Sequence, residues 1–345
     1  MGGGKDFFYA SCDQNCTNVN NWTVIYLLSN HGTSTFDISD NITPQRYFTL
    51  NPQGRPRFVY QDNNYFYLEP DHLGSYYVYC DSGCTQASNW YETRITLAAQ
   101  YDYEVIKYPS LTFTGDGRPR PLADLIPLSG GDGIYYFACD VACGDGDHWQ
   151  RVGLYQRGSG TSASWDLDLD SANRPRFAFY QGEGSSSGEK LHYAWCNDNC
   201  LNAAAWGNVE VGLGLKNGEN PDLEIDQQGR PRVAYIMQGG GGTGYAWCTG
   251  NCESQQPQWQ HKVLDTATSL EADYPVALPV TCDVGMWDSI APVLAFNPAG
   301  QPRMAHDAAY DGRCWIDDDP TDNKPPQFIP WQIRHSVRVV LFSQP

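Results

Sequence analysis

The sequence predicts an all-β protein, a five-bladed β-propeller of four-stranded antiparallel blades. Three observations lead to this prediction. A pair of cysteines with three residues between them occurs five times, a Pro-Arg dipeptide occurs five times in alternation with it, and polar and apolar residues alternate around both motifs. Alternation with period two, interrupted by Gly, Asn, Asp and Pro, indicates short strands joined by tight turns. Repetition of such units along the whole chain is typical of propeller blades.

The first motif is the cysteine pair, CxxxC. Its copies are Cys12/Cys16, Cys80/Cys84, Cys139/Cys143, Cys196/Cys200 and Cys248/Cys252. A tryptophan follows the second cysteine by six residues in four copies and by seven in the last, where it is Trp259. Zinc would need further Cys or His ligands beside each pair, but the seven histidines do not recur with the repeats. We therefore expect disulfides that close the turn between two strands of a hairpin, with metal binding and redox chemistry as the alternatives. Cys282 and Cys314 lie outside the pattern and could pair with each other.

The second motif is the Pro-Arg turn, whose prolines lie at positions 56, 119, 175, 231 and 302. The strand before each turn ends in a short polar residue that can bond to the following backbone. These residues are Asn51, Thr114, Asp170, Asp226 and Asn297. In one repeat, residues 191–236, the segments LHYAWC, WGNVEVG, PDLEID and RPRVAYI read as four strands. Four strands of this kind make one blade.

The two ends of the chain determine how the ring of blades closes. The chain begins inside a CxxxC hairpin and ends after a Pro-Arg hairpin, so we expect residues 7–27 to complete the C-terminal repeat and leave no open sheet edge. The segment 333–342 resembles a further LHYAWC strand and either adds an outer strand or competes for the closing position. Six blades and an irregular β-sandwich are the alternative architectures.

The repeats also resemble a known type of protein. Strings such as YAWCNDNC and PDLEIDQQGRPRVAY are similar to repeats of secreted bacterial β-propeller proteins. The resemblance covers nearly the whole chain. Five-bladed propellers include lectins and several glycosidase families, so it implies a function in carbohydrate binding or carbohydrate hydrolysis.

Composition narrows the class of partner. The net charge is −18 and only 18% of residues are charged, which argues against nucleic acid and anionic membrane surfaces. No apolar run is long enough for a transmembrane helix, so no membrane insertion is expected. Twelve cysteines, ten of them in close pairs, favour an oxidising compartment, which predicts a secreted or cell-surface protein. We expect residues 1–6 to be a tag or linker and residues 7–345 to form a single domain.

Four carboxylates break the repeat in the strand before the Pro-Arg turn. Two adjacent repeats place Asp166 and Asp168, and Asp222 and Glu224, at positions that the other repeats fill with Tyr, Ser, Thr, Val or Ala. If this strand is the innermost one, the four groups crowd near the propeller axis and need compensation. They are therefore candidate catalytic residues.

Three interpretations of these carboxylates stay open. The first is ion pairing with Arg176 and Arg232 of the adjacent Pro-Arg motifs. The second is binding of calcium or another hard cation. The third is a pair of acid and base carboxyls for glycoside hydrolysis, which resembles five-bladed glycosidases with acidic residues at the axis.

Two further segments depart from the repeat. His306 and Asp307 replace an aromatic or apolar pair at the end of a strand beside a long insertion, which makes them candidate ligand-binding residues. Asp317, Asp319 and Asp322 lie in an acidic loop whose oxygens suit calcium, although a solvated acidic loop is the simpler interpretation. Apart from calcium, no cofactor is expected.

The sequence favours an extracellular binding module that recognises carbohydrate or a glycoconjugate. A glycoside hydrolase with acidic residues near the axis is the first alternative. A structural or protein-docking module, joined to other domains of a larger surface protein, is the second. A binder should carry equivalent sites in each blade, whereas an enzyme should carry one site where the repeats diverge.

Overall fold

The computed structural model describes residues 6–29, 47–62, 74–96, 98–99, 102–127, 132–156, 163–181, 189–214, 217–237, 242–276, 282–316 and 327–342. Within these ranges the protein is all-β apart from one α-helix, α1 (Ala267–Asp273), and short 3-10 turns. The 3-10 turns are η1 (Val19–Asn21), η3 (Ala87–Asn89), η4 (Gly146–His148) and η5 (Ala203–Ala205). None of these helices combines the length and apolar character that crossing a membrane requires.

Five antiparallel sheets follow one another along the chain, and four of them have four strands. Sheet 1 contains β3 (Phe48–Leu50), β4 (Pro56–Asp62), β5 (Gly74–Cys80) and β6 (Trp90–Arg94). Sheet 2 contains β9 (Val105–Phe113), β10 (Pro119–Ile126), β11 (Gly133–Ala138) and β12 (Gln150–Gln156). Sheet 3 contains β13 (Ala163–Leu169), β14 (Pro175–Gln181), β15 (Lys190–Cys196) and β16 (Trp206–Glu210). In each, a Pro-Arg hairpin precedes a CxxxC hairpin, as the sequence predicts.

The remaining sheets complete the arrangement. Sheet 4 contains β17 (Glu219–Ile225), β18 (Pro231–Ile236), β19 (Gly242–Gly250) and β20 (Gln258–Thr266). Sheet 5 has three strands, β21 (Cys282–Phe296), β22 (Pro302–Ile316) and β23 (Gln327–Leu341). Two hairpins stand apart from these sheets: β1 (Asp6–Ser11) with β2 (Thr23–Ser29), and β7 (Ala98–Ala99) with β8 (Asp102–Tyr103).

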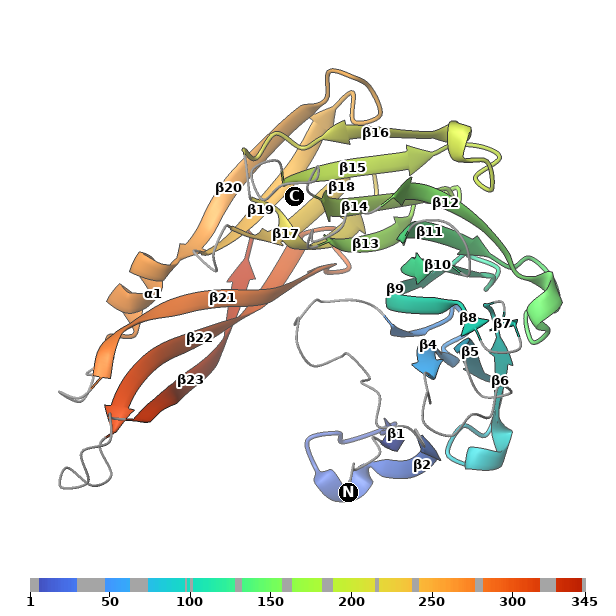
Figure 1. Ribbon diagram of the computed structural model, residues 1–345, viewed down its shortest axis with the longest axis horizontal. Coiled ribbons are helices and arrows are strands. Elements are labelled where there is room, and N and C mark those ends of the chain that lie inside the picture. The colour runs from blue at the N-terminus through green and yellow to red at the C-terminus, as the bar shows by residue number, and fades with distance from the viewer. Residues whose placement is uncertain are drawn as a thin grey trace.

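The sheets pack face to face in chain order and form an arc (Figure 1). Their first strands lie against one another, β9 on β13, β13 on β17 and β17 on β21, so these are the inner strands of the arc. Apolar clusters fill the space between neighbouring sheets. Between sheets 2 and 3, for example, Leu122 and Tyr136 pack with Leu167 and Phe177.

The CxxxC turns are built alike in every copy. A disulfide joins the two cysteines of each copy, with Cα atoms 5.7–5.9 Å apart, so the disulfide prediction for the five pairs is confirmed within the structure. The bonded pairs are Cys12–Cys16, Cys80–Cys84, Cys139–Cys143, Cys196–Cys200 and Cys248–Cys252. The residue before the second cysteine has a positive φ in all five copies, a conformation that favours Gly and Asn. These residues are Asn15, Gly83, Ala142, Asn199 and Asn251.

The second cysteine of each pair lies in the turn itself, so the disulfide closes the turn that follows the strand, as the sequence predicts. Cys80 ends β5 and is fully buried, whereas Cys84 is half-buried in the turn, six residues before β6 begins at Trp90. Cys252 is likewise half-buried in a turn beyond β19, and Cys16 is exposed in the turn after β1. The left-handed residue before the second cysteine folds the chain back onto the end of its own strand. Each disulfide therefore closes a loop at the end of one strand and does not join two strands.

The recurrent tryptophan holds the CxxxC turn from the other side. In the four copies with six-residue spacing, its indole N–H donates to the carbonyl of the second cysteine at 2.9–3.0 Å. The fifth copy has one more residue in the loop, and the indole N–H of Trp259 is buried without a hydrogen-bond partner among the described residues. The altered spacing thus removes one turn contact.

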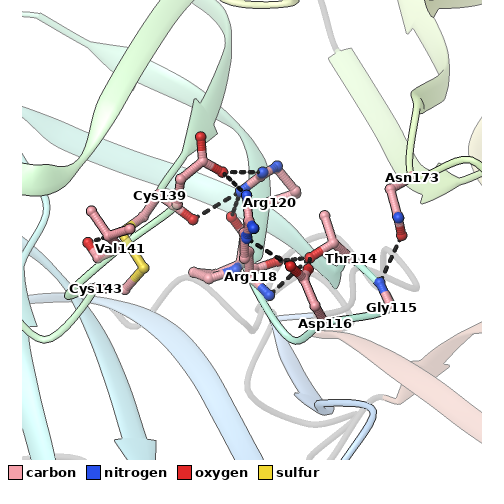
Figure 2. Close-up of polar contacts among 11 residues, drawn as sticks. Thr114, Gly115, Asp116, Arg118, Arg120, Cys139, Val141, Cys143 and Asn173 are labelled. Carbon is pink, nitrogen blue, oxygen red and sulfur yellow. Dashed lines mark hydrogen bonds and ion pairs between the residues drawn. A yellow bond between two sulfur atoms is a disulfide. The ribbon is translucent and has the colours of Figure 1, made fainter.

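The Pro-Arg turn has a recurrent geometry that ties two hairpins together. The capping residue accepts backbone N–H groups from the following turn; Asp170, for example, accepts those of Ala172 and Arg174 at 2.9 Å. Figure 2 shows the turn of sheet 2, where Arg120 donates to the carbonyl of Cys139 at 2.9 Å. The recurrent arginine therefore joins the Pro-Arg turn to the CxxxC turn of its own sheet in sheets 1 to 3.

The ends of the arc differ from the expected closure. Residues 7–27 do not pair with the C-terminal repeat in the described part of the chain; β1 pairs with β2, and this hairpin packs on sheet 1 through Phe7 and Leu27. The place beside β22 is taken by β23, in which Leu341 lies opposite Arg303. In the open arc the segment 333–342 therefore holds the place beside β22, with which it pairs up to Leu341. Figure 1 shows β1–β2 and sheet 5 at opposite ends of the arc.

Candidate functional site

The carboxylates at the second position of the inner strands bridge neighbouring sheets. Asp166 is fully buried, accepts the hydroxyl of Ser110 at 2.6 Å from sheet 2, and accepts the backbone N–H of Leu223 at 2.9 Å from sheet 4. Asp222 accepts the backbone N–H of Leu294 in sheet 5 in the same way. These contacts use the carboxylates as acceptors for backbone donors that would otherwise be buried without partners.

The carboxylates at the fourth position lie closer to solvent. Asp168 accepts the backbone N–H of Ile225 at 2.9 Å, and it faces Arg176 in the strand register. Glu224 faces Arg232 in the same way. The four candidate residues are thus distributed over the inner strands, and the contacts of Asp166, Asp168 and Asp222 point to a bracing role.

The Pro-Arg arginines have other partners than the sequence suggested. Arg176 is buried and pairs with Asp170 at 3.0 Å and with Glu253 of sheet 4 at 2.8 Å. Arg232 pairs with Asp226 at 2.6 Å. The capping residues and Glu253, rather than the candidate carboxylates, therefore supply the counter-charges in these contacts. This difference arises because the arginine side chain extends along its strand toward the turn.

His306 lies in a buried cluster between sheets 4 and 5. Its Nε2 is 2.8 Å from Oδ2 of Asp265, and Arg338 donates to the other oxygen of that carboxylate at 2.8 Å. These hydrogen bonds to Asp265 raise the pKa of Arg338 above its usual range. His306 is buried and Asp307 is half-buried, so the structure places the pair in the sheet-to-sheet contact and gives the His306 ring little access to a ligand.

The acidic loop with Asp317, Asp319 and Asp322 lies outside the described residues. Within the described ranges, no group of three or more His, Cys, Asp or Glu side chains is arranged to hold a metal ion. Calcium binding by the loop stays a prediction. The backbone register also places Cys282 opposite Cys314, whereas the structure does not describe their side chains.

An acidic cluster absent from the sequence-based candidates lies between sheets 3 and 4, at the end away from the Pro-Arg turns. The hydroxyl of Tyr180 donates to Glu189 at 3.1 Å. Burial, and then the neighbouring charge of Glu189, raise the pKa of Glu219 above its ordinary value. Glu219 begins β17, where the strand register shifts before Asp222 and Asn220 has a φ of 48°. Bulges of this kind re-aim side chains near functional sites.

A cleft of about 500 Å³ lies between the outer strands of sheets 1 and 2. Its lining combines aromatic rings with many hydrogen-bonding groups. The residues are Tyr76, Thr93, Arg94, Ile95, Thr96, Phe137, Gly146, Asp147, Trp149, Gln150 and Arg151. A cleft of this size can accommodate a small ligand or a short stretch of a polymer.

Two arginines of the cleft are held in place by neighbouring side chains. Arg151 forms a bidentate ion pair with Glu104, with Nη2 and Oε1 2.6 Å apart, and Glu104 is buried. The guanidinium of Arg94 lies over the ring of Tyr76, 5.9 Å from its centroid. Such contacts hold the donor groups in fixed directions, which favours recognition of a ligand with hydroxyl or carboxylate oxygens.

The sequence contains a weak signal for this cleft. Arg94 is the fourth residue after Trp90, and the equivalent position in sheet 3 is Glu210, which pairs with Lys190 at 2.6 Å. The charge at the fourth residue after the recurrent tryptophan therefore differs between sheet 1 and sheet 3. The sequence shows this difference, but only the packing of sheet 1 on sheet 2 shows that Arg94 and Arg151 line one cleft.

Comparisons with known proteins give structural similarity alone. No protein-family model and no curated protein matches the sequence. An α-L-arabinofuranosidase from Lactobacillus brevis is 12% identical, with a TM-score of 0.42 over 83% of this chain and 89% of its own. A protein of unknown function from Dyadobacter fermentans is 12% identical, with a TM-score of 0.46 over 82% and 81%. An ulvan lyase of polysaccharide lyase family PL25 is 11% identical, with a TM-score of 0.42 over 84% and 69%. Similarity at this level leaves the function to be inferred from this chain's own side chains.

Proposed function

We propose that the protein is an extracellular carbohydrate-binding module and that the cleft between sheets 1 and 2 holds the ligand. The observation that carries the proposal is the lining of this cleft, in which the indole of Trp149 lies among Thr93, Arg94, Gln150 and Arg151. A sugar ring has an apolar face and a rim of hydroxyl groups. Aromatic rings therefore suit the face, and fixed polar side chains suit the hydroxyls.

The ligand class follows from the same side chains. The fixed guanidinium groups of Arg94 and Arg151 can donate to hydroxyl or carboxylate oxygens, whereas the lining offers no large apolar surface for a lipid. Trp149 is anchored by its hydrogen bond to Cys143 at 3.0 Å, so its ring needs no ordering when a ligand binds. A polysaccharide with exposed hydroxyls, and with some acidic groups, fits this chemistry.

A glycan array followed by titration calorimetry tests the proposal. Gln150→Ala and Asp147→Asn change exposed cleft residues, and each should weaken the binding of the best glycan at least fivefold without changing the melting temperature. Gln260→Ala is the matched control, because Gln260 follows Trp259 as Gln150 follows Trp149 and is also exposed. Equal affinities for all three variants and the parent would place the ligand elsewhere.

Hydrolysis of a carbohydrate at a separate site between sheets 3 and 4 is the second candidate function, and the Glu189 and Glu219 cluster favours it. Glycoside hydrolysis needs two carboxyls whose environments separate their pKa values. Burial and the charge of Glu189 raise the pKa of Glu219, which suits a general acid. Release of reducing ends from a polysaccharide, lost in Glu219→Gln while binding at the cleft is kept, supports this function. Binding without any cleavage contradicts it.

We infer further that the five repeats are five blades of one propeller in an oxidising, extracellular setting. Sheets 1 to 4 share one strand order, and sheet 5 begins with the same Pro-Arg hairpin. Five described disulfides support the extracellular location, because such bonds persist in oxidising compartments. Secretion is tested by recovery of the protein, with its disulfides formed, from the medium of the native host.

A further inference from the structure

Each sheet has a forward face, which packs on the next sheet along the chain, and a rear face, which packs on the preceding sheet. The third strands of sheets 1 to 4 carry a buried tyrosine on the forward face: Tyr77, Tyr136, Tyr193 and Tyr245. In sheet 5 the strand register gives this position to Val339, which is 64% exposed. The forward face of sheet 5 therefore lacks the cover that every other sheet has.

The inner strand of sheet 5 shows the same difference. Ser110, Asp166 and Asp222 are buried on the forward faces of sheets 2 to 4, where Asp166 and Asp222 accept a backbone N–H of the next sheet. The equivalent residue of β21 is Val293, which is 49% exposed. Ala305 lies between Val293 and Val339 in the strand register, so the uncovered face is continuous and apolar.

At the opposite end of the arc, part of the rear face of sheet 1 is also uncovered. The inner strands of sheets 2 to 5 each place a buried leucine on the rear face: Leu111, Leu167, Leu223 and Leu294. The equivalent residue of β3 is Phe48, which is 43% exposed, and its neighbour on that face, Leu50, is also exposed. In the described part of the chain, only the β1–β2 hairpin precedes β3, and its Tyr9 ring lies 6.4 Å from the ring of Phe48.

The β1–β2 hairpin already covers the outer part of this rear face. In the repeat, Phe7 and Tyr9 correspond to Leu191 and Tyr193 of β15. Phe7 stacks on Phe58 with ring centroids 5.6 Å apart, and Tyr9 contacts Trp90 with centroids 5.0 Å apart. The hairpin thus lies where the third and fourth strands of a preceding blade would lie, and only the inner two strands of that blade are missing.

We infer that the ring closes within one chain, with the forward face of β21 and β22 docked on the rear face of β3 and β4. By the spacing of Asp166 to Leu223, Val293 would lie against Phe48. In this arrangement β1 takes the place beside β22 that residues 337–341 hold in the open arc. The docked contact continues the sheet-to-sheet interface that already joins sheets 1 to 5, and it buries apolar side chains and removes the open ends.

A double-mutant cycle on the full chain tests the closure. Phe48→Ala and Val293→Ala should each lower the urea midpoint of unfolding, and the double variant should lower it by less than the sum, because the two residues touch. In an open arc Phe48 contacts Tyr9 but not Val293, so the effects of the two changes should be additive. Tyr91→Ala combined with Val293→Ala is the control pair, since Tyr91 is exposed on an outer strand of sheet 1 and should show no coupling.

Crosslinking distinguishes closure within one chain from association of two copies. Phe48→Cys with Val293→Cys should give a disulfide between these two positions in a monomeric product, identified by mapping peptides without reduction. A crosslinked dimer would overturn the inference in favour of a second copy, and so would association of the protein that increases with its concentration in sedimentation experiments. Additive effects with no crosslink would overturn it in favour of the open arc.

Discussion

Oδ2 of Asp166 on β13 accepts the backbone N–H of Leu223 on β17 at 2.9 Å, so a side chain of one sheet is bonded to the main chain of the next. The same carboxylate accepts the hydroxyl of Ser110 from the preceding sheet at 2.6 Å. Three consecutive sheets are therefore joined through one buried side chain. This explains why a charged residue is retained in the interior of the arc.

Removal of this bridge should destabilise the protein. Asp166→Ala leaves the Leu223 N–H and the Ser110 hydroxyl without their acceptor in a buried setting, which we expect to lower the free energy of unfolding by about 3 kcal/mol. Asp166→Asn retains part of the bridge and should lose less. Urea unfolding measures both. Asp198→Ala, at an exposed turn position, is the control, and a loss no larger than that of the control contradicts the bridging role.

The raised pKa of Glu219 predicts a pH-dependent stability. Because the folded state raises the pKa of this carboxyl above its ordinary 4.5, the folded state binds its proton more tightly than the unfolded chain does. Its contribution to stability is present below pH 4.5 and is lost as the pH rises through the folded-state pKa. Glu219→Gln should therefore raise the melting temperature at pH 7 and leave it unchanged at pH 3.5. Glu210→Gln, which removes the partner of Lys190, should not raise it.

The turn of sheet 2 contains a strained alanine. Ala142 has a φ of 49°, whereas the other four CxxxC turns place Asn or Gly at this position. Left-handed backbone is unfavourable for alanine by about 1 kcal/mol and less so for asparagine. Ala142→Asn should raise the free energy of unfolding by about 0.5–1 kcal/mol in a chemical denaturation experiment. Val141→Asn, at the exposed neighbour without a positive φ, should give no gain.

The two spacings of the recurrent tryptophan predict unequal effects of the same substitution. Trp206 donates its indole N–H to Cys200 at 2.9 Å, while the indole N–H of Trp259 is buried without a hydrogen-bond partner among the described residues. Trp206→Phe should therefore destabilise the protein by about 1 kcal/mol more than Trp259→Phe. Parallel urea titrations of the two variants measure the difference. Equal losses would mean that the hydrogen bond contributes nothing.

The disulfide pattern can be read directly from the protein. Peptide mapping without reduction should recover each CxxxC pair linked within itself, as the five described disulfides require. The strand register places Cys282 opposite Cys314, so a sixth link between them is expected. Free thiols that bind zinc stoichiometrically would contradict the structural role of these cysteines.

The sequence by itself determined the parts that depend on neighbours along the chain. The strands, the Pro-Arg turns, the capping residue such as Asp170 and the CxxxC disulfides all follow from residues within about six positions of one another. Local hydrogen bonds and covalent geometry constrain such spacings strongly, so one repeat is enough to read them. The all-β class and the grouping of four strands were predictable for the same reason.

The tertiary structure decided the parts that depend on how one sheet lies on the next. Asp166 and Asp222 were recognisable as unusual, but only the approach of Leu223 and Leu294, 57 and 72 residues away, makes them bridges. The cleft formed by Arg94 and Arg151 likewise exists only where sheet 1 meets sheet 2. The sequence offers two similar strands for the position beside β22, and in the open arc β23 holds it. Contacts between distant segments depend on burial and on competition between alternative partners, which a pattern within one repeat does not contain.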